Sequence, residues 1–133
     1  TEKDLKLVPG EWITLFGESK LCQRICRSPL VVREKDFVVS MTLEELDRLK
    51  AGMNYGSDSG ESVILQGIID IFFYEGEDIV LVDYKTDYDL DEKTVEGYKV
   101  QLEIYSKALE AATGRKVKEK LLYAVRTGKE IPC

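Results

Sequence analysis

The sequence predicts a single mixed α/β domain, residues 1–133, with a central β-sheet flanked by helices on both faces. Three features predict this class: a β-hairpin in the middle of the chain, a long amphipathic helix directly after it, and a further strand after that helix. A strand, a crossing helix and a returning strand form a right-handed βαβ unit, so the sheet is expected to contain parallel as well as antiparallel pairs.

The first third of the chain predicts a helix, a strand and a short helix. Residues 1–10 are polar and expected to be flexible. A helix is expected from Trp12 until Pro29 ends it, because apolar residues recur at helical spacing. The run 31–40 alternates as a strand does, and residues 42–45 form a capping box that opens a short helix to about residue 50. Residues 51–61 lack any apolar period and are expected to form a flexible loop. The apolar residues of the first helix are Leu15, Phe16, Leu21, Cys22, Ile25 and Cys26.

The hairpin consists of two runs rich in β-branched and aromatic residues, 63–74 and 79–85, joined by the polar turn 75–78. A turn centred between Gly76 and Glu77 sets the register of the whole hairpin. The expected pairs are Tyr74 with Ile79, Phe72 with Leu81, and Asp70 with Asp83.

This register places Asp70 opposite Asp83 in otherwise apolar strands. Two like charges about 4 Å apart repel by roughly 4 kcal/mol at an effective dielectric constant of about 20, so a shared proton or a divalent cation is expected to compensate them. Lys85 follows Asp83 by two residues and therefore lies on the same face of the strand. An ordinary ion pair at a strand end is the alternative interpretation of Asp83 and Lys85.

The helix after the hairpin is expected from about residue 91 to 113, with Gly114 as its left-handed C-cap. Gln101 precedes Tyr105 by four residues, so both side chains lie on one side of the helix. By spacing alone Tyr105 is a core residue. Residues 117–126 predict another strand, followed by a turn and a last short extended piece. The predicted buried stripe is Val95, Tyr98, Leu102, Tyr105, Leu109 and Ala112.

Several function classes find no support in the sequence. The three cysteines, Cys22, Cys26 and Cys133, lack the spacing of a zinc site, and reduced thiols in a cytoplasmic protein are the expected state. No apolar run approaches the length of a membrane span. No phosphate-binding Gly-x-x-x-x-Gly-Lys loop is found either, so any ATP-driven motor is expected to lie outside this sequence.

Three short motifs together resemble the RecB-like PD-(D/E)xK nucleases. They are Gly67-Ile-Ile-Asp70, Asp83-Tyr-Lys85-Thr-Asp87 and Gln101-Leu-Glu-Ile-Tyr105, which are similar to the Gly-x-x-Asp, Asp-x-Lys and Gln-x-x-x-Tyr motifs of that family. Within the family, the residues in and around these motifs are most similar to those of the C-terminal nuclease domains of AddA-type helicase–nuclease proteins. The resemblance extends from about Leu15 to the C-terminus, and it implies a restriction endonuclease-like core belonging to a larger protein.

The resemblance also implies roles for individual residues. Asp70 and Asp83 would hold one or two Mg²⁺ or Mn²⁺ ions, helped by the backbone carbonyl of Tyr84. Lys85 would hold or deprotonate the attacking water, and Gln101 and Tyr105 would orient DNA. Glu34, in an Arg-Glu pair followed closely by a phenylalanine, either lies near this site or is an ordinary surface residue.

The implied activity is that of a Mg²⁺-dependent exodeoxyribonuclease. It would cleave single DNA strands released by an ATP-dependent helicase, with an AddB-type protein as its partner in a heterodimer, during double-strand break processing and recombinational repair. No iron–sulfur cluster is expected, and ATP would serve only the helicase part. The net charge of −6 predicts weak unaided DNA binding. The alternatives are a degenerate nuclease fold that guides DNA or has a structural role, and an unrelated domain whose acids are not neighbours.

One expected ligand has no counterpart in the sequence. Family members carry a Gly-x-x-x-His-like motif on a preceding helix, and this chain contains no histidine. We therefore expect the metal site of this chain to be incomplete, and the isolated chain to be weakly active or inactive.

Overall fold

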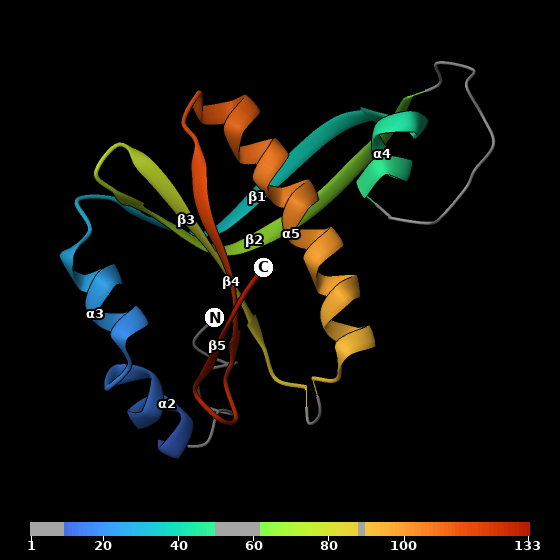
Figure 1. Cartoon of the computed structure of the whole chain (residues 1–133). Coiled ribbons are helices and arrows are strands. Elements are labelled where there is room, and N and C mark those ends of the chain that lie inside the picture. The colour runs from blue at the N-terminus through green and yellow to red at the C-terminus, as the bar shows by residue number, and fades with distance from the viewer. Residues whose placement is uncertain (1–9, 50–61, 88–89) are drawn as a thin grey trace.

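The protein folds around a five-stranded mixed sheet with strand order β1-β2-β3-β4-β5 (Figure 1). The computed structural model describes residues 10–49, 62–87 and 90–133. The strands β1 to β3 and β4 to β5 pair antiparallel, whereas β3 and β4 pair parallel across the helix that joins them. The predicted fold class is therefore confirmed. The elements are α2 (Gly10–Gly17), α3 (Lys20–Arg27), β1 (Val31–Thr42), α4 (Leu43–Leu49), β2 (Ser62–Glu75), β3 (Asp78–Lys85), α5 (Glu92–Thr113), β4 (Val117–Ala124) and β5 (Lys129–Pro132).

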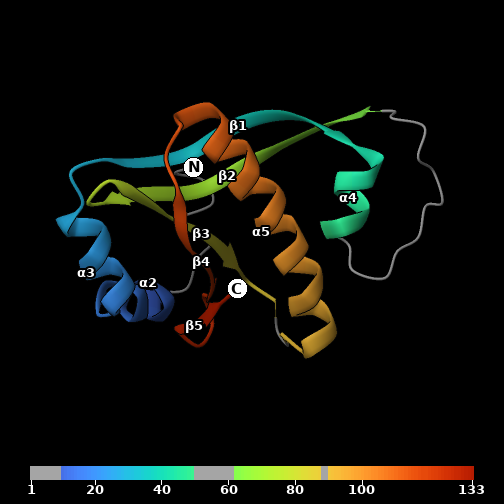
Figure 2. The same cartoon turned by 45° about the horizontal axis from the view of Figure 1, so that its top comes forward.

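Two hydrophobic clusters lie on opposite faces of the sheet, because successive residues of a strand point to opposite sides. Leu21 and Ile25 of α3 pack against one face, and Leu102 and Leu109 of α5 pack against the other. The two helices accordingly lie on either side of β3 and β4 in the turned view (Figure 2). The core therefore fixes the position of α5 relative to the end of β3, where the predicted site residues lie.

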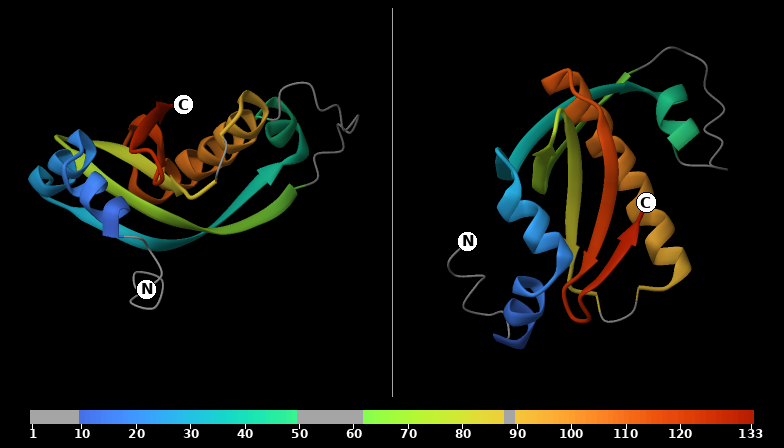
Figure 3. Two further views of the ribbon diagram at one scale, coloured as in Figure 1. Left: turned by 90° about the horizontal axis from the view of Figure 1, so that it is seen from below. Right: turned by 60° about the vertical axis from the view of Figure 1, so that its left-hand side comes forward.

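Strands β1 and β2 continue as a curved two-stranded ribbon beyond the end of β3 and lead to α4 (Figure 3). The register of the two strands stays constant from Val31–Phe73 to Thr42–Ser62, and within this range only the position of Glu34 and Asp70 is not paired. Val38, Ile64 and Ile68 are exposed on the ribbon, each by more than half of its surface. The ribbon thus separates from β3 near Asp70, which places that residue at a fork in the sheet.

The single helix predicted from Trp12 to Pro29 is wrong in one respect, since the structure has two helices here. Ser19 is extended, with φ −74° and ψ 155°, and its side chain accepts a hydrogen bond from the Cys22 N–H. A serine in this geometry is a preferred N-cap, so it begins a new helix after α2 ends at Gly17. The break turns Phe16 toward the cluster around Leu21.

The predicted limits of the long helix are confirmed by its caps. Asp91 accepts from the Thr94 N–H at the beginning, and Gly114 adopts φ 69° at the end. The predicted stripe contains one error, Ala112, which is exposed, while Ser106 and Ala108 are buried. Ala112 lies two residues before the C-cap, and apolar spacing no longer corresponds to burial at this end of the helix.

The expected loop 51–61 and residues 1–9 of the expected flexible N-terminus lie outside the described residues. Gly10 belongs to α2. None of the helices within the described ranges combines the length and hydrophobicity that crossing a bilayer requires.

Candidate active site

The predicted hairpin register is confirmed up to the fork. Tyr74 pairs with Ile79, Phe72 with Leu81, and the ladder ends at Ile71 and Val82. It stops one pair before the predicted partners Asp70 and Asp83. The Asp70 carboxylate, through Oδ2, instead accepts the hydrogen bond of the Tyr84 backbone N–H at 2.9 Å. A side chain thus replaces a backbone acceptor where the two strands separate.

Asp70 and Asp83 are neighbours in the fold. Asp83 is 5% exposed. Burial, together with a side-chain hydrogen bond to Asp83, raises the pKa of Asp70 to about 7, because an ionised carboxylate is poorly solvated there and is repelled by its neighbour. The Asp70 carboxyl therefore titrates close to neutral pH. The interpretation that the two acids are unrelated in space is excluded.

Lys85 is the cation of this site. Its Nζ lies 2.7 Å from Asp83 Oδ2 and donates to Gln101 Oε1 at 3.2 Å. The same ammonium lies 3.8 Å from the centre of the Tyr98 ring, a distance at which the ring attracts a cation. The Lys85 side chain is only 15% exposed, so its head group is held in one place.

Helix α5 extends this network away from the sheet. Gln101 Nε2 donates to the Tyr105 hydroxyl at 2.9 Å, as the four-residue spacing predicted. Tyr98 donates to Asp87 Oδ2 at 2.7 Å. The sequence indicated Tyr98 only as a core residue and gave Asp87 no role in the site. Two spacings in the sequence could have indicated them: Tyr98 lies three residues before Gln101, and Asp87 lies two residues after Lys85.

Packing explains why the first motif has a glycine, Gly67, at its first position. A Cβ atom at Gly67 would lie 2.7 Å from a ring carbon of Phe37, its cross-strand partner. The Phe37 ring crosses over Gly67 and meets the Tyr105 ring edge to face, with centroids 4.8 Å apart. The glycine therefore lets β1 support the tyrosine that holds Gln101.

Glu34 stands opposite Asp70 in the β1–β2 register, between the pairs Arg33–Ile71 and Lys35–Ile69. Its φ of 51° lies in the left-handed region, which is uncommon for a residue with a side chain. Strained backbone of this kind is concentrated at functional sites. The structure thus brings Glu34 to the strand position facing Asp70, as one of the two interpretations expected, and its role stays a prediction.

A cavity of about 740 Å³ lies on the other face of the sheet, between α2, α3 and the strands. It reaches the fork, because Asp70 and Glu34 are among its lining residues. Most of its wall is apolar and aromatic. The sequence gave no indication of it, since the cavity depends on the break between α2 and α3.

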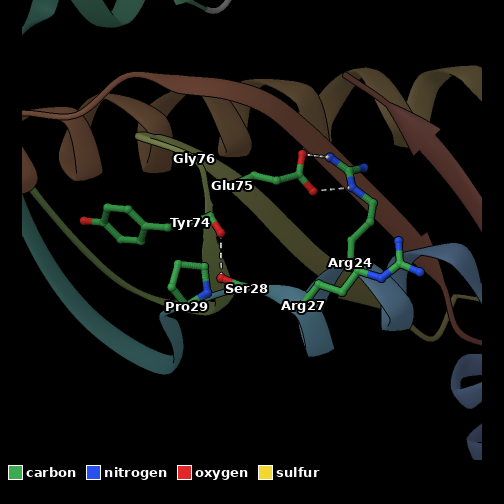
Figure 4. Close-up of a pocket in the computed structure, with 7 residues that line it drawn as sticks. All are labelled: Arg24, Arg27, Ser28, Pro29, Tyr74, Glu75 and Gly76. Atoms are coloured by element: carbon green, nitrogen blue, oxygen red, sulfur yellow. Dashed lines mark hydrogen bonds and ion pairs between the residues drawn. The ribbon is translucent and has the colours of Figure 1, made fainter.

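The opposite end of the hairpin has a second charged cluster (Figure 4). Arg24 donates to both carboxylate oxygens of Glu75, at 2.8 and 2.9 Å, and also contacts Glu119 at 2.6 Å. Lys118 lies 2.8 Å from Glu75. These partners lower the pKa of Glu75 to about 2. A small pocket of about 200 Å³ beside this cluster is lined by Arg27, Ser28, Pro29 and Tyr74 as well.

The chemistry of the acid pair fits a hard divalent cation. Carboxylate oxygens are the ligands that Mg²⁺ and Mn²⁺ take in proteins. A carboxyl whose pKa is raised to about 7 by burial and a neighbouring carboxyl lies where added positive charge is favourable. Among the described residues, no group of three or more His, Cys, Asp or Glu side chains is placed to hold a metal ion. Asp70 and Asp83 are therefore the donors that the described chain offers.

The sequence profile of the PD-(D/E)XK nuclease superfamily matches residues 7–131, and the chain belongs to this superfamily. Its relatives include ATP-dependent helicase/nuclease subunits of the AddA type. The chain is 39% identical to the one of Clostridium acetobutylicum over 98% of its length, and 41% identical to the one of Thermoanaerobacter sp. (strain X514) over 96%. The corresponding protein of Acetivibrio thermocellus is 39% identical over 97%. The expected relationship to AddA-type proteins is confirmed, and the chain spans about a tenth of the length of these relatives.

Proposed function

We propose that this domain is the deoxyribonuclease of an AddA-type helicase–nuclease and hydrolyses single DNA strands with Mg²⁺ or Mn²⁺. The observation that carries the proposal is the neighbouring pair Asp70 and Asp83 with Lys85 bonded to one of them. These residues belong to the short stretches that resemble the motifs of the superfamily to which the chain belongs, which supports the proposal.

In this proposal Asp70 and Asp83 hold the cation, with the Tyr84 carbonyl as a further oxygen donor. A divalent cation, when bound, supplies positive charge that neutralises the phosphodiester and acidifies the attacking water. Asp83 also fixes the Lys85 ammonium at 2.7 Å. Gln101 and Tyr98 restrict it from the helix side.

Lys85 would position the attacking water and stabilise the negative charge that develops on the phosphate oxygens. Gln101 and Tyr105 would orient the strand, because their hydrogen bond links the phenol to the amide that contacts Lys85. Such preorganisation is effective because the donors do not have to reorganise when charge develops.

The wider proposal places the domain in a heterodimer with an AddB-type protein that processes DNA double-strand breaks for recombinational repair. Its helicase part would use ATP and deliver single strands to this site. The names of the relatives, which describe an ATP-dependent helicase/nuclease, support this assignment.

A second candidate is a degenerate nuclease fold that guides DNA or has a structural role. Two observations favour it: the described residues offer no third side-chain ligand beside the pair, and the chain carries a net charge of −6. The retained Asp83–Lys85 ion pair favours the enzyme.

A side-by-side digestion of labelled single-stranded DNA with Mg²⁺ tests the proposal. The samples are this chain and a longer chain that includes the helix expected upstream, each with an Asp83→Ala counterpart. We expect Asp83-dependent cutting by the longer chain and little by this one. Robust Asp83-dependent cutting by this chain alone would show that no upstream ligand is needed, and an inactive longer chain would favour the degenerate fold.

A further inference from the structure

The Lys85 ammonium is enclosed by side chains from two elements. Asp83 of β3 lies 2.7 Å from Nζ, and Gln101 of α5 accepts its hydrogen bond at 3.2 Å. The Tyr98 ring, also on α5, has its centre 3.8 Å from the same Nζ. A lysine side chain is a compact charge on a flexible stem, so it keeps one position only where neighbours limit it from several sides. The ring therefore limits the ammonium on the side that the two hydrogen-bonding partners leave open.

Tyr98 is itself fixed at its far end. Its hydroxyl donates to Asp87 Oδ2 at 2.7 Å, a distance typical of a hydrogen bond to an ionised carboxylate. The tyrosine thus spans from α5 to the residues that follow β3, with its oxygen bound to a carboxylate and its ring face against a cation. Rotation of the ring away from Lys85 would break the bond to Asp87.

The backbone next to Asp87 is held by the end of β4. The Val125 N–H donates to the Lys85 carbonyl at 2.9 Å, and Arg126 Nε donates to the Thr86 carbonyl at 2.6 Å. Asp87 is half-buried. Because the two residues before it are bonded to a neighbouring strand, the Asp87 carboxylate extends from a fixed backbone toward α5.

A role as a further metal ligand is the alternative for Asp87, the last acid of the second motif. The described residues contain no group of three or more His, Cys, Asp or Glu side chains placed to hold a metal ion, so Asp87 does not join the acid pair in one cluster. Its Oδ2 is also engaged by Tyr98. Asp87 is therefore connected to Lys85 through the tyrosine.

We propose that Asp87 and Tyr98 are positioning residues for Lys85: the Asp87 carboxylate orients the Tyr98 ring, and the ring holds the ammonium beside Asp83. This inference rests on the proposed nuclease function and adds to it how the lysine is kept where negative charge develops on the phosphate. A displaced lysine should slow the chemical step more than it weakens DNA binding, because the contact is needed chiefly in the transition state.

The contact between Lys85 and Tyr98 can be measured without cleavage. The ε-methylene protons of Lys85 lie next to an ammonium held over the ring, so the ring current should shift their NMR signal upfield from those of exposed lysines. The sample is the 133-residue chain with labelled lysine, and Lys85→Arg identifies the signal. Tyr98→Leu should abolish the upfield shift. Tyr98→Phe and Asp87→Ala should each reduce it, and the matched control Tyr74→Phe, near the hairpin turn, should leave it unchanged.

The kinetic test uses the full-length helicase–nuclease of the proposed function. Tyr98→Leu should lower kcat for single-strand cleavage about ten- to hundredfold with little change in KM, since it removes a cation–π contact and its anchor. Tyr98→Phe and Asp87→Ala should each lower kcat about three- to tenfold, as for loss of one hydrogen bond. Asp87→Asn should lose less than Asp87→Ala, because its amide oxygen still accepts from the phenol.

A double variant tests whether Asp87 acts through Tyr98. Asp87→Ala combined with Tyr98→Phe should be no slower than either single variant, because both changes remove the same hydrogen bond. Additive losses would overturn the proposal, since Asp87 would then act independently of the phenol. Loss of metal-dependent stabilisation in the Asp87→Ala chain would overturn it as well and identify Asp87 as a ligand.

The two measurements separate this inference from the proposed function. An unmoved Lys85 signal in the Tyr98→Leu chain would overturn the inference, even if Asp83-dependent cleavage is found. A normal kcat of Tyr98→Leu in an enzyme that depends on Asp83 would overturn it too. A full-length protein that cuts no DNA would contradict the nuclease function instead, and the NMR signal would still decide whether Tyr98 holds the ammonium.

Discussion

The two ends of the β2–β3 hairpin differ in how far their charged side chains are compensated by opposite charges. At the turn, two cations, Arg24 and Lys118, are bonded to two carboxylates, Glu75 and Glu119. At the fork, Lys85 forms an ion pair with Asp83, and the neighbouring Asp70 has no ion pair of its own among the described residues. The charges at the turn therefore compensate one another, whereas the fork lacks one positive charge.

The pKa values of the acids follow this difference. The pKa of Glu75 falls to about 2 because Arg24 and Lys118 favour its ionised form. The pKa of Asp70 rises to about 7 because burial and Asp83 disfavour its ionised form. Charge that is matched within the fold contributes to stability, and charge that is not matched costs stability and points to a ligand.

The largest expected effect is on DNA cleavage, which should depend on the residues at the fork and not on those at the turn. In the full-length helicase–nuclease of the proposed function, Asp83→Ala or Lys85→Ala should lower the rate of cleavage by about a thousandfold or more, since each removes a charged group from the site of charge development. Unwinding by the helicase part should persist. Glu75→Ala at the turn is the matched control and should cut normally. Loss of unwinding together with cleavage would indicate a folding defect instead.

The next effect concerns stability at the turn. Arg24→Gln leaves Glu75 and Glu119 close together with only Lys118, so the free energy of unfolding should fall by about 1–3 kcal/mol, between the values for exposed and buried ion pairs. Urea denaturation measures it. Arg48→Gln, which removes an exposed pair with Glu44 on α4, should change stability by less than about 0.5 kcal/mol. Equal effects of the two substitutions would contradict the role of Arg24 in joining the two acids.

A smaller effect is expected from pH. The folded-state pKa of Glu75, about 2, lies below its ordinary value of 4.5, so its contribution is complete above pH 4.5 and is lost as the pH falls toward 2. Glu75→Gln should therefore reduce the acid dependence of the free energy of unfolding in this window. Glu77→Gln, two residues further on in the turn, serves as the control. Parallel pH curves for the Glu75→Gln and unmodified chains would refute the assignment.

Local signals predicted much of the fold and the site. The polar turn 75–78 fixed the register that brings Asp70 to Asp83, and Asp91 and Gly114 marked the ends of α5 because caps are short-range features. The break at Ser19 was missed because the apolar spacing continues across it. The contact of Tyr98 with Lys85, the backbone conformation of Glu34 and the cavity depend on how helices pack on the sheet, which no local pattern contains.

The central claim is that the fork lacks one positive charge and that a divalent cation supplies it. Its most direct test is thermal unfolding of the 133-residue chain at pH 8 with and without Mg²⁺ or Mn²⁺, together with Asp70→Asn, Asp83→Asn and the turn control Glu75→Gln. At a metal concentration of about ten times Kd, selective binding to the folded state contributes about 1.4 kcal/mol, which should raise the Tm of the unmodified and Glu75→Gln chains by about 5 °C. The Asp70→Asn and Asp83→Asn chains should melt independently of metal. An unmoved melting curve for the unmodified chain in millimolar metal, or an equal rise in the Asp70→Asn and Asp83→Asn chains, would contradict the claim.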